Sequence, residues 1–69
     1  MSDAKIRAFE KIKESHAKFR AREFLRAACL LDDAAEILKS AGEWTRDDTC
    51  TTIVALRRRM AKFAEEVKL

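Results

Sequence analysis

The side chains of this chain that could do chemistry are mainly its arginines, together with one histidine and two cysteines. A guanidinium group presents its N–H donors in one plane and binds carboxylates or phosphates through two parallel hydrogen bonds. Arg22 and Arg26 are one helical turn apart, and Arg57, Arg58 and Arg59 are consecutive. These spacings predict a basic surface that docks on an acidic protein surface or on phosphates, although an ordinary solvated helix face would carry the same residues.

Neither a metal site nor a catalytic site is indicated by the other reactive side chains. His16 is the only histidine, and Cys29 and Cys50 lie elsewhere on the predicted helices, so we expect His16 to be a packed or interface residue. The chain has no glycine-rich phosphate-binding loop and no Ser/His/Asp or Cys/His arrangement facing a cleft. We therefore expect a protein that is not an enzyme and needs no cofactor or metal ion.

The two cysteines also bear on where the protein works. In a helical hairpin their sulfur atoms would lie on the order of 12 Å apart along the axis, which is too far for a disulfide. Unpaired thiols are typical of the reducing cytosol. The sequence has neither a signal peptide nor a run of about 20 apolar residues. We expect a soluble cytoplasmic protein that does not contact a membrane.

Apolar side chains recur at steps of three and four residues, which is the helical period. The chain has 69 residues, 39% of them charged, with no proline and one glycine, a composition that favours a single helical domain over residues 1–69. The pattern predicts a long helix over about residues 3–40, capped by Ser2 and ended by Gly42 in the left-handed conformation. Beyond Phe19 the apolar face widens to two stripes, which implies two neighbouring helices.

A second helix is predicted over about residues 46–68, with Thr45 as its N-cap. Its apolar positions are spaced four, three, four, three and four residues apart, as in a coiled-coil seam: Thr49, Ile53, Leu56, Met60, Phe63 and Val67. The predicted fold is therefore all-α, an antiparallel two-helix hairpin.

The two predicted helices differ in length, about 57 Å against about 33 Å. Residues 3–18 would overhang the shorter helix and leave apolar side chains uncovered, each worth about 1.5–3 kcal/mol on burial. We therefore predict a homodimer in which two hairpins form a four-helix bundle-like assembly. Glu23 interrupts the apolar stripe, and it is expected to pair with an arginine of the second copy, such as Arg59, or to fix the register. The predicted dimer interface comprises Ile6, Phe9, Ile12, His16, Phe19, Glu23, Leu30 and Ile37.

Charge is distributed unevenly along the chain. Residues 1–26 hold eight Lys or Arg and four acids, residues 27–48 hold two and six, and residues 49–69 hold five and two. In a hairpin the open end is then basic, and it would attract an acidic partner surface. Leu25 and Cys29 project away from the apolar stripes, and an apolar spot rimmed by arginines is typical of a binding site, although single apolar surface residues are common. The predicted partner-binding residues are Arg20, Arg22, Leu25, Arg26, Cys29, Arg57, Arg58 and Lys62.

In size and predicted hairpin form, the whole chain resembles small phage-encoded proteins that disable host proteins, of the quorum-sensing anti-activator type. That resemblance implies an inhibitor in the host cytoplasm that binds a LuxR-type transcription factor near its DNA-binding region. The predicted hairpin is also similar to the plasmid copy-number RNA-binding protein, although the two helices of that protein are nearly equal in length. We therefore expect a protein-binding inhibitor or anti-activator, with nucleic-acid binding as the alternative and a scaffold subunit as a third possibility.

Overall fold

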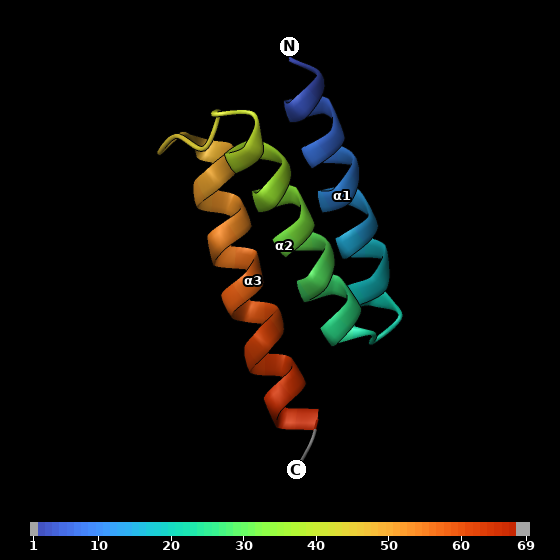
Figure 1. The fold of residues 1–69 in the computed structure, drawn as a ribbon. Coiled ribbons are helices and arrows are strands. Elements are labelled where there is room, and N and C mark those ends of the chain that lie inside the picture. Colours follow the sequence, from blue (N-terminus) through green and yellow to red (C-terminus); the bar gives the residue numbers. More distant parts are fainter. Residues whose placement is uncertain (1, 68–69) are drawn as a thin grey trace.

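The computed structural model describes residues 2–67, with side chains described through residue 66. This part of the chain forms three helices, α1 (Asp3–Arg20), α2 (Phe24–Ser40) and α3 (Asp48–Val67) (Figure 1). The prediction of an all-α domain is confirmed. The number of helices differs from the prediction, because the chain reverses direction where a continuous helix was expected.

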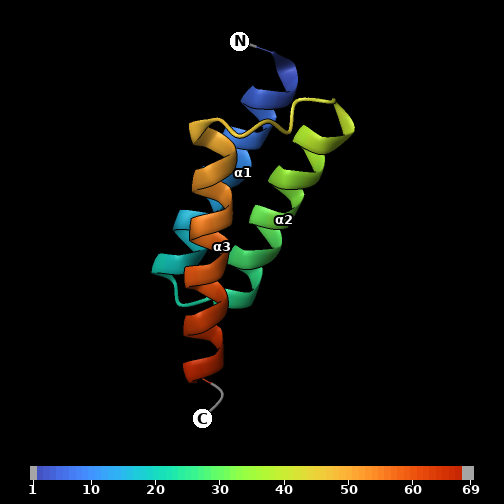
Figure 2. The same ribbon diagram turned by 90° about the vertical axis from the view of Figure 1, so that its left-hand side faces the viewer.

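The predicted helix over residues 3–40 is therefore wrong as a single element. The molecule is 39 Å along its longest axis, whereas a helix over 3–40 alone would span about 57 Å. Helices α1 and α3 run in the same direction, and α2 runs antiparallel to both and packs against each of them (Figures 1 and 2). The end of the last helix predicted at residue 68 lies outside the described residues.

The helix termini follow from local capping chemistry. Ser2 caps α1, because its hydroxyl oxygen accepts a hydrogen bond from an amide of the first turn, as predicted. Gly42 takes the left-handed conformation with φ 70°, also as predicted. The N-cap of α3 is Asp47 rather than Thr45, since the amide of Cys50 donates to the Asp47 carboxylate at 3.0 Å. A carboxylate is favoured there because it also faces the positive end of the helix dipole.

Helix α2 is the central element of the bundle. Its fully buried positions, Ala27, Leu31, Ala34 and Leu38, are spaced four, three and four residues apart, so they form one stripe along the helix. Half-buried side chains flank this stripe on both sides. The two neighbours that the widened apolar face implied are α1 and α3 of the same chain.

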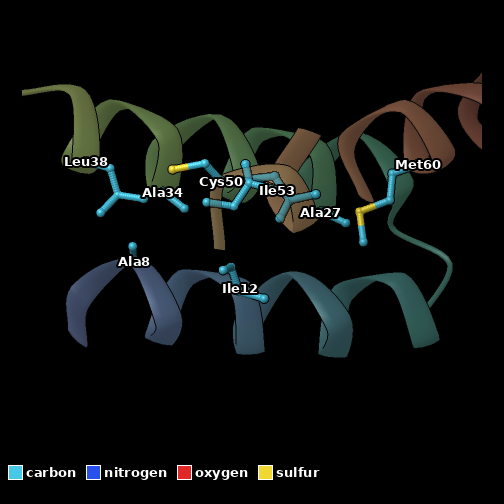
Figure 3. Close-up of a cluster of buried hydrophobic side chains, with 9 residues drawn as sticks. Ala8, Ile12, Ala27, Ala34, Leu38, Cys50, Ile53 and Met60 are labelled. Carbon is cyan, nitrogen blue, oxygen red and sulfur yellow. The ribbon is translucent and has the colours of Figure 1, made fainter. Parts of the chain in front are cut away.

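The core lies between all three helices, and Figure 3 shows α1 contributing from one side. Its buried members are Ala8, Ile12, Ala27, Leu31, Ala34, Leu38, Cys50, Ile53 and Met60. In the seam predicted for the last helix, Ile53 and Met60 are buried and the remaining described members are half-buried. The side chain of Val67 lies outside the described residues.

Helix α1 turns a different face inwards from the one predicted. Its fully buried side chains include Ala8 and Ser15, whereas Ile6 and Phe9 are 43% and 37% exposed. The hydroxyl of Ser15 donates to the carbonyl of Ile12 at 2.6 Å, which satisfies it inside the core. Small side chains at a helix contact let the two helix axes approach closely. The sequence pattern emphasised large residues and so missed this packing.

Two polar contacts hold the start of α1 against the α2–α3 loop. The Ser2 hydroxyl donates to Oε2 of Glu43 at 2.7 Å, and Nζ of Lys5 lies 3.4 Å from Oδ2 of Asp47. Because α1 folds back along α2, the overhang from which the homodimer was predicted does not occur. The homodimer stays a prediction.

Within residues 2–67, no helix combines the length and the apolar character needed to cross a membrane.

Candidate partner-binding surface

The turn between α1 and α2 is built around a left-handed residue that is not glycine. Arg22 has φ 63°. Its amide donates to the carbonyl of Phe19 at 3.0 Å, and the amide of Glu23 donates to the carbonyl of Lys18 at 2.9 Å. These two hydrogen bonds define a Schellman motif, in which the residue after the C-cap takes the left-handed conformation.

Helix α2 ends in the same motif. The amide of Gly42 donates to the carbonyl of Lys39 at 3.1 Å, and the amide of Glu43 donates to the carbonyl of Leu38 at 2.8 Å. The local sequences also correspond, since Ala21-Arg22-Glu23-Phe24 matches Ala41-Gly42-Glu43-Trp44 in the pattern Ala-x-Glu-aromatic. One turn carries the glycine that the motif favours, and the other carries an arginine.

An arginine at this position disfavours the fold. A left-handed backbone costs a residue with a Cβ atom about 1–2 kcal/mol, and glycine avoids that cost. The side chain of Arg22 is exposed, and within the described part of the chain it takes part in none of the ion pairs around the turn. A strained residue that gives the fold no compensating contact points to a role outside the fold.

Three phenylalanines, one from each helix, close the core at this end. The ring centroids of Phe19 and Phe24 lie 5.2 Å apart, those of Phe19 and Phe63 lie 5.4 Å apart, and those of Phe24 and Phe63 lie 5.7 Å apart. The guanidinium of Arg59 lies 5.8 Å from the Phe19 centroid and 5.9 Å from that of Phe63, a cation–π arrangement. This aromatic cluster packs the two helix ends that flank the α1–α2 turn against α3.

Cationic side chains outnumber acidic ones in the segments around the aromatic cluster. Residues 18–26 and 57–66 together hold eight Lys or Arg and three acids. One of the acids, Glu23, lies 3.5 Å from Nζ of Lys18 and 3.7 Å from Nε of Arg26. Glu23 thus has two partners in its own chain, whereas the sequence suggested an arginine of a second copy. The end of the bundle at the α1–α2 turn is basic.

An exposed apolar residue lies beside these charges. Leu25, in the first turn of α2, is 60% exposed, and the thiol of Cys29 one turn later is also exposed and unpaired. Across the α2–α3 contact, the guanidinium of Arg57 donates to both carboxylate oxygens of Asp32, and that hydrogen-bonded carboxylate raises the pKa of Arg57. Arg57 therefore has an ion-pair partner within its own chain, in an exposed position.

The predicted partner-binding residues fall into two groups. Arg20 ends α1, and the turn and the beginning of α2 carry Arg22, Leu25, Arg26 and Cys29. The second group lies on exposed positions of α3: Arg57, Arg58 and Lys62. We call Arg20, Arg22, Leu25 and Arg26 the turn patch, since these four are exposed and lie within seven consecutive residues of the chain.

The fold separates the residues predicted for a dimer interface. Ile12 is buried in the core and Phe19 belongs to the aromatic cluster. Helix α2 holds two half-buried members, Leu30 and Ile37. The members that stay exposed are on α1: Ile6, Phe9 and His16.

Several hollows open on the surface of the bundle. A hollow of about 550 Å³ lies between α1 and α2, with Arg7 and Lys11 on one wall and Asp33 and Glu36 on the other. In the described range, no three His, Cys, Asp or Glu side chains gather in a way that could hold a metal ion.

Sequence reasoning missed the α1–α2 turn and, with it, the aromatic cluster. The pattern Ala-x-Glu-aromatic occurs twice, at residues 21–24 and 41–44. The copy around Gly42 was correctly predicted to end a helix, and the copy around Arg22 was the signal for the missed turn. The signal was missed because residue 22 is an arginine, a good helix former.

The fold and this surface define a small three-helix bundle with a basic, partly apolar end. No known protein family, curated protein or solved structure shows significant similarity to this chain.

Proposed function

We propose that the protein is a non-enzymatic binding module that docks through the turn patch on an acidic surface of another protein and blocks the action of that protein. The observation that carries this proposal is Arg22, an exposed arginine at the apex of a turn whose backbone favours glycine. At this exposed position, the chain has a residue that makes the fold less stable than glycine would, and a partner protein can reach it.

The neighbours of Arg22 suit protein recognition. Leu25 offers an apolar contact that is 60% exposed, and an apolar centre with an arginine rim is common in interfaces. Arg20 and Arg26 add guanidinium donors at the same end. A partner carboxylate could bind a free guanidinium through two hydrogen bonds, which makes acidic side chains the preferred contact.

The test compares charge reversal at two exposed arginines. Arg22→Glu keeps the strained backbone but inverts the charge, whereas Arg46→Glu makes the same change at the opposite end of the bundle, in the α2–α3 loop. Each protein is used to capture partners from nuclease-treated lysate of the native host at moderate salt. We expect wild type and Arg46→Glu to retain one stoichiometric protein, and Arg22→Glu and Leu25→Glu to lose it.

Two outcomes would contradict the proposal. Equal capture by all four proteins would show that the turn patch is not the contact. Recovery of nucleic acid without nuclease, and of nothing after it, would favour the nucleic-acid alternative. In that case the affinity should fall by about a thousandfold or more between 50 and 200 mM salt for six or more phosphate contacts.

The narrower predictions concern the partner and the assembly. Under the resemblance to quorum-sensing anti-activators, the captured protein is a LuxR-type transcription factor. The homodimer predicted from the apolar pattern would be the form that binds it. Native mass of the eluted complex checks both points.

A further inference from the structure

A hollow beside Trp44 lies between the α2–α3 loop and helix α3. Its volume is about 330 Å³, at the lower end of the range of about 300–1,000 Å³ that is usual for small-molecule sites. The loop lines it with residues 44–46. Helix α3 lines it with side chains at helical spacing, which therefore share one face of the helix. These side chains belong to Thr51, Val54, Ala55 and Arg58.

Part of this hollow is apolar. Trp44 is half-buried and packs against the core, and the buried Cys50 belongs to the same lining. Val54, by contrast, is 40% exposed. An apolar group of a ligand that covered Val54 and the accessible part of the Trp44 ring would remove apolar surface from water, which is favourable.

Two guanidinium groups also border the hollow. Arg46 of the loop and Arg58 of α3 both belong to its lining, and both are exposed. Within the described residues, neither takes part in an ion pair. The described lining contains no acidic residue, since the nearest acids in the chain, Asp47 and Asp48, lie outside it. The hollow therefore combines apolar surface with two positive charges.

The surface next to the hollow has the same character. A second hollow, of about 380 Å³, adjoins the first, because the two share three lining residues, among them Trp44. It is bordered by Lys39, whose Nζ lies 5.1 Å from the centroid of the Trp44 ring. Its acid is Asp32, and the carboxylate of Asp32 already accepts hydrogen bonds from Arg57. The second hollow thus adds apolar surface without adding an unpaired negative charge.

We infer that the hollow beside Trp44 binds a small organic anion with an apolar body, such as an alkyl or aryl carboxylate. The apolar body would contact Trp44 and Val54, and the anionic head would accept hydrogen bonds from Arg46 and Arg58. Small-molecule sites commonly combine apolar walls with a few polar groups that fix the orientation of the ligand. The α2–α3 loop and the α1–α2 turn are at opposite ends of the bundle (Figure 1), so this inference is independent of the proposed function.

The inference is tested by titration with octanoate. Trp44 is the only tryptophan of the chain, so its fluorescence reports binding at this hollow. Octylammonium has the same chain with the opposite charge, and acetate has the same head without the chain. We expect octanoate to give a saturable change, to bind at least ten times more tightly than either control compound, and to shift the backbone NMR signals of Thr51 and Ala55.

Three results of this titration would overturn the inference. Comparable binding of octylammonium would show a general apolar effect, and comparable binding of acetate would show a general attraction of anions. A fluorescence signal that does not saturate with octanoate would show that the hollow is not a binding site for this class of ligand.

Variants of the protein locate the site. The double variant Arg46→Gln with Arg58→Gln should weaken octanoate binding at least tenfold. Its matched control is Arg7→Gln with Lys13→Gln, which removes two exposed positive charges from α1, outside both hollows, and should bind octanoate as wild type does. Val54→Glu, which places a carboxylate at the apolar part, should also weaken binding at least tenfold. Circular dichroism checks that each variant stays helical, and equal affinity of the two double variants would refute the site.

Charge reversal separates this inference from the proposed function. Arg46→Glu should abolish octanoate binding and keep the capture of the host protein, whereas Arg22→Glu should lose capture and keep octanoate binding. Octanoate binding to wild type without any effect of Arg22→Glu on capture would support the hollow and refute the turn patch. Loss of capture in Arg22→Glu, without octanoate binding to wild type, would support the turn patch and refute the hollow.

Discussion

Replacing Arg22 by glycine should make this protein more stable. The left-handed backbone costs the arginine about 1–2 kcal/mol, while glycine gives up roughly 0.5–1 kcal/mol through its greater freedom in the unfolded chain. The arginine side chain contributes no ion pair around the turn that could offset this difference. The free energy of unfolding should therefore rise by about 0.5–1 kcal/mol. In a domain of this size that corresponds to a Tm increase of roughly 2–8 °C.

Urea unfolding followed by circular dichroism measures the change, and the dependence on urea should keep its slope, because the buried surface is the same. The matched variant is Gly42→Ala, in the second copy of the motif. A Cβ atom there meets nothing within 4 Å, so only backbone strain acts, and we expect a loss of about 1 kcal/mol. If Arg22→Gly lowered the stability, or Gly42→Ala left it unchanged, the assignment of strain to Arg22 would be refuted.

Leu31→Ala should destabilise the fold by about 2–5 kcal/mol in thermal or urea unfolding, because Leu31 is fully buried, whereas Leu25→Ala should have almost no effect. The hydrogen bond from the amide of Cys50, helped by a nearby ammonium group, lowers the pKa of Asp47. The ionised Asp47 side chain therefore contributes fully to the stability of the fold above the unfolded-state pKa of about 3.9. This contribution is lost as the pH falls through the lower pKa of the folded state. Asp47→Asn should remove that part of the acid dependence of urea unfolding. Burial raises the pKa of the Cys50 thiol, so a thiol reagent at mildly alkaline pH should modify the exposed Cys29 quickly and Cys50 only on unfolding. Fast modification of both thiols would contradict the buried position of Cys50.

The helical period and the ends of helices at Ser2 and Gly42 were predictable because they depend on short-range chemistry, although the N-cap of α3 is Asp47 and not the predicted Thr45. Ser2 and Gly42 each form hydrogen bonds with backbone groups no more than one helical turn away. Such local contacts can be inferred from neighbouring residues in the sequence. The break after α1 was not predictable in the same way, since Arg22 favours a helix locally and takes the left-handed conformation only in the folded turn. Once that break was missed, α1 had no partner in the chain, and a second copy was invoked to cover it.

The face of α1 was misjudged for a related reason. A pattern of large apolar residues points to Phe9 and Ile6, but close packing of α1 on α2 needs small side chains such as Ala8 and Ser15. Which stripe turns inwards depends on the neighbouring helix, and therefore on the fold as a whole. Ile6 and Phe9 are therefore left partly exposed on the surface of α1.

The proposed trade of stability for recognition at Arg22 is tested most directly by measuring both properties on Arg22→Gly. We predict that this variant unfolds at a higher urea concentration than wild type and captures less of the host partner from nuclease-treated lysate. A variant that is more stable and captures the partner as well as wild type would contradict the proposal, because the strained arginine would then serve no purpose in binding.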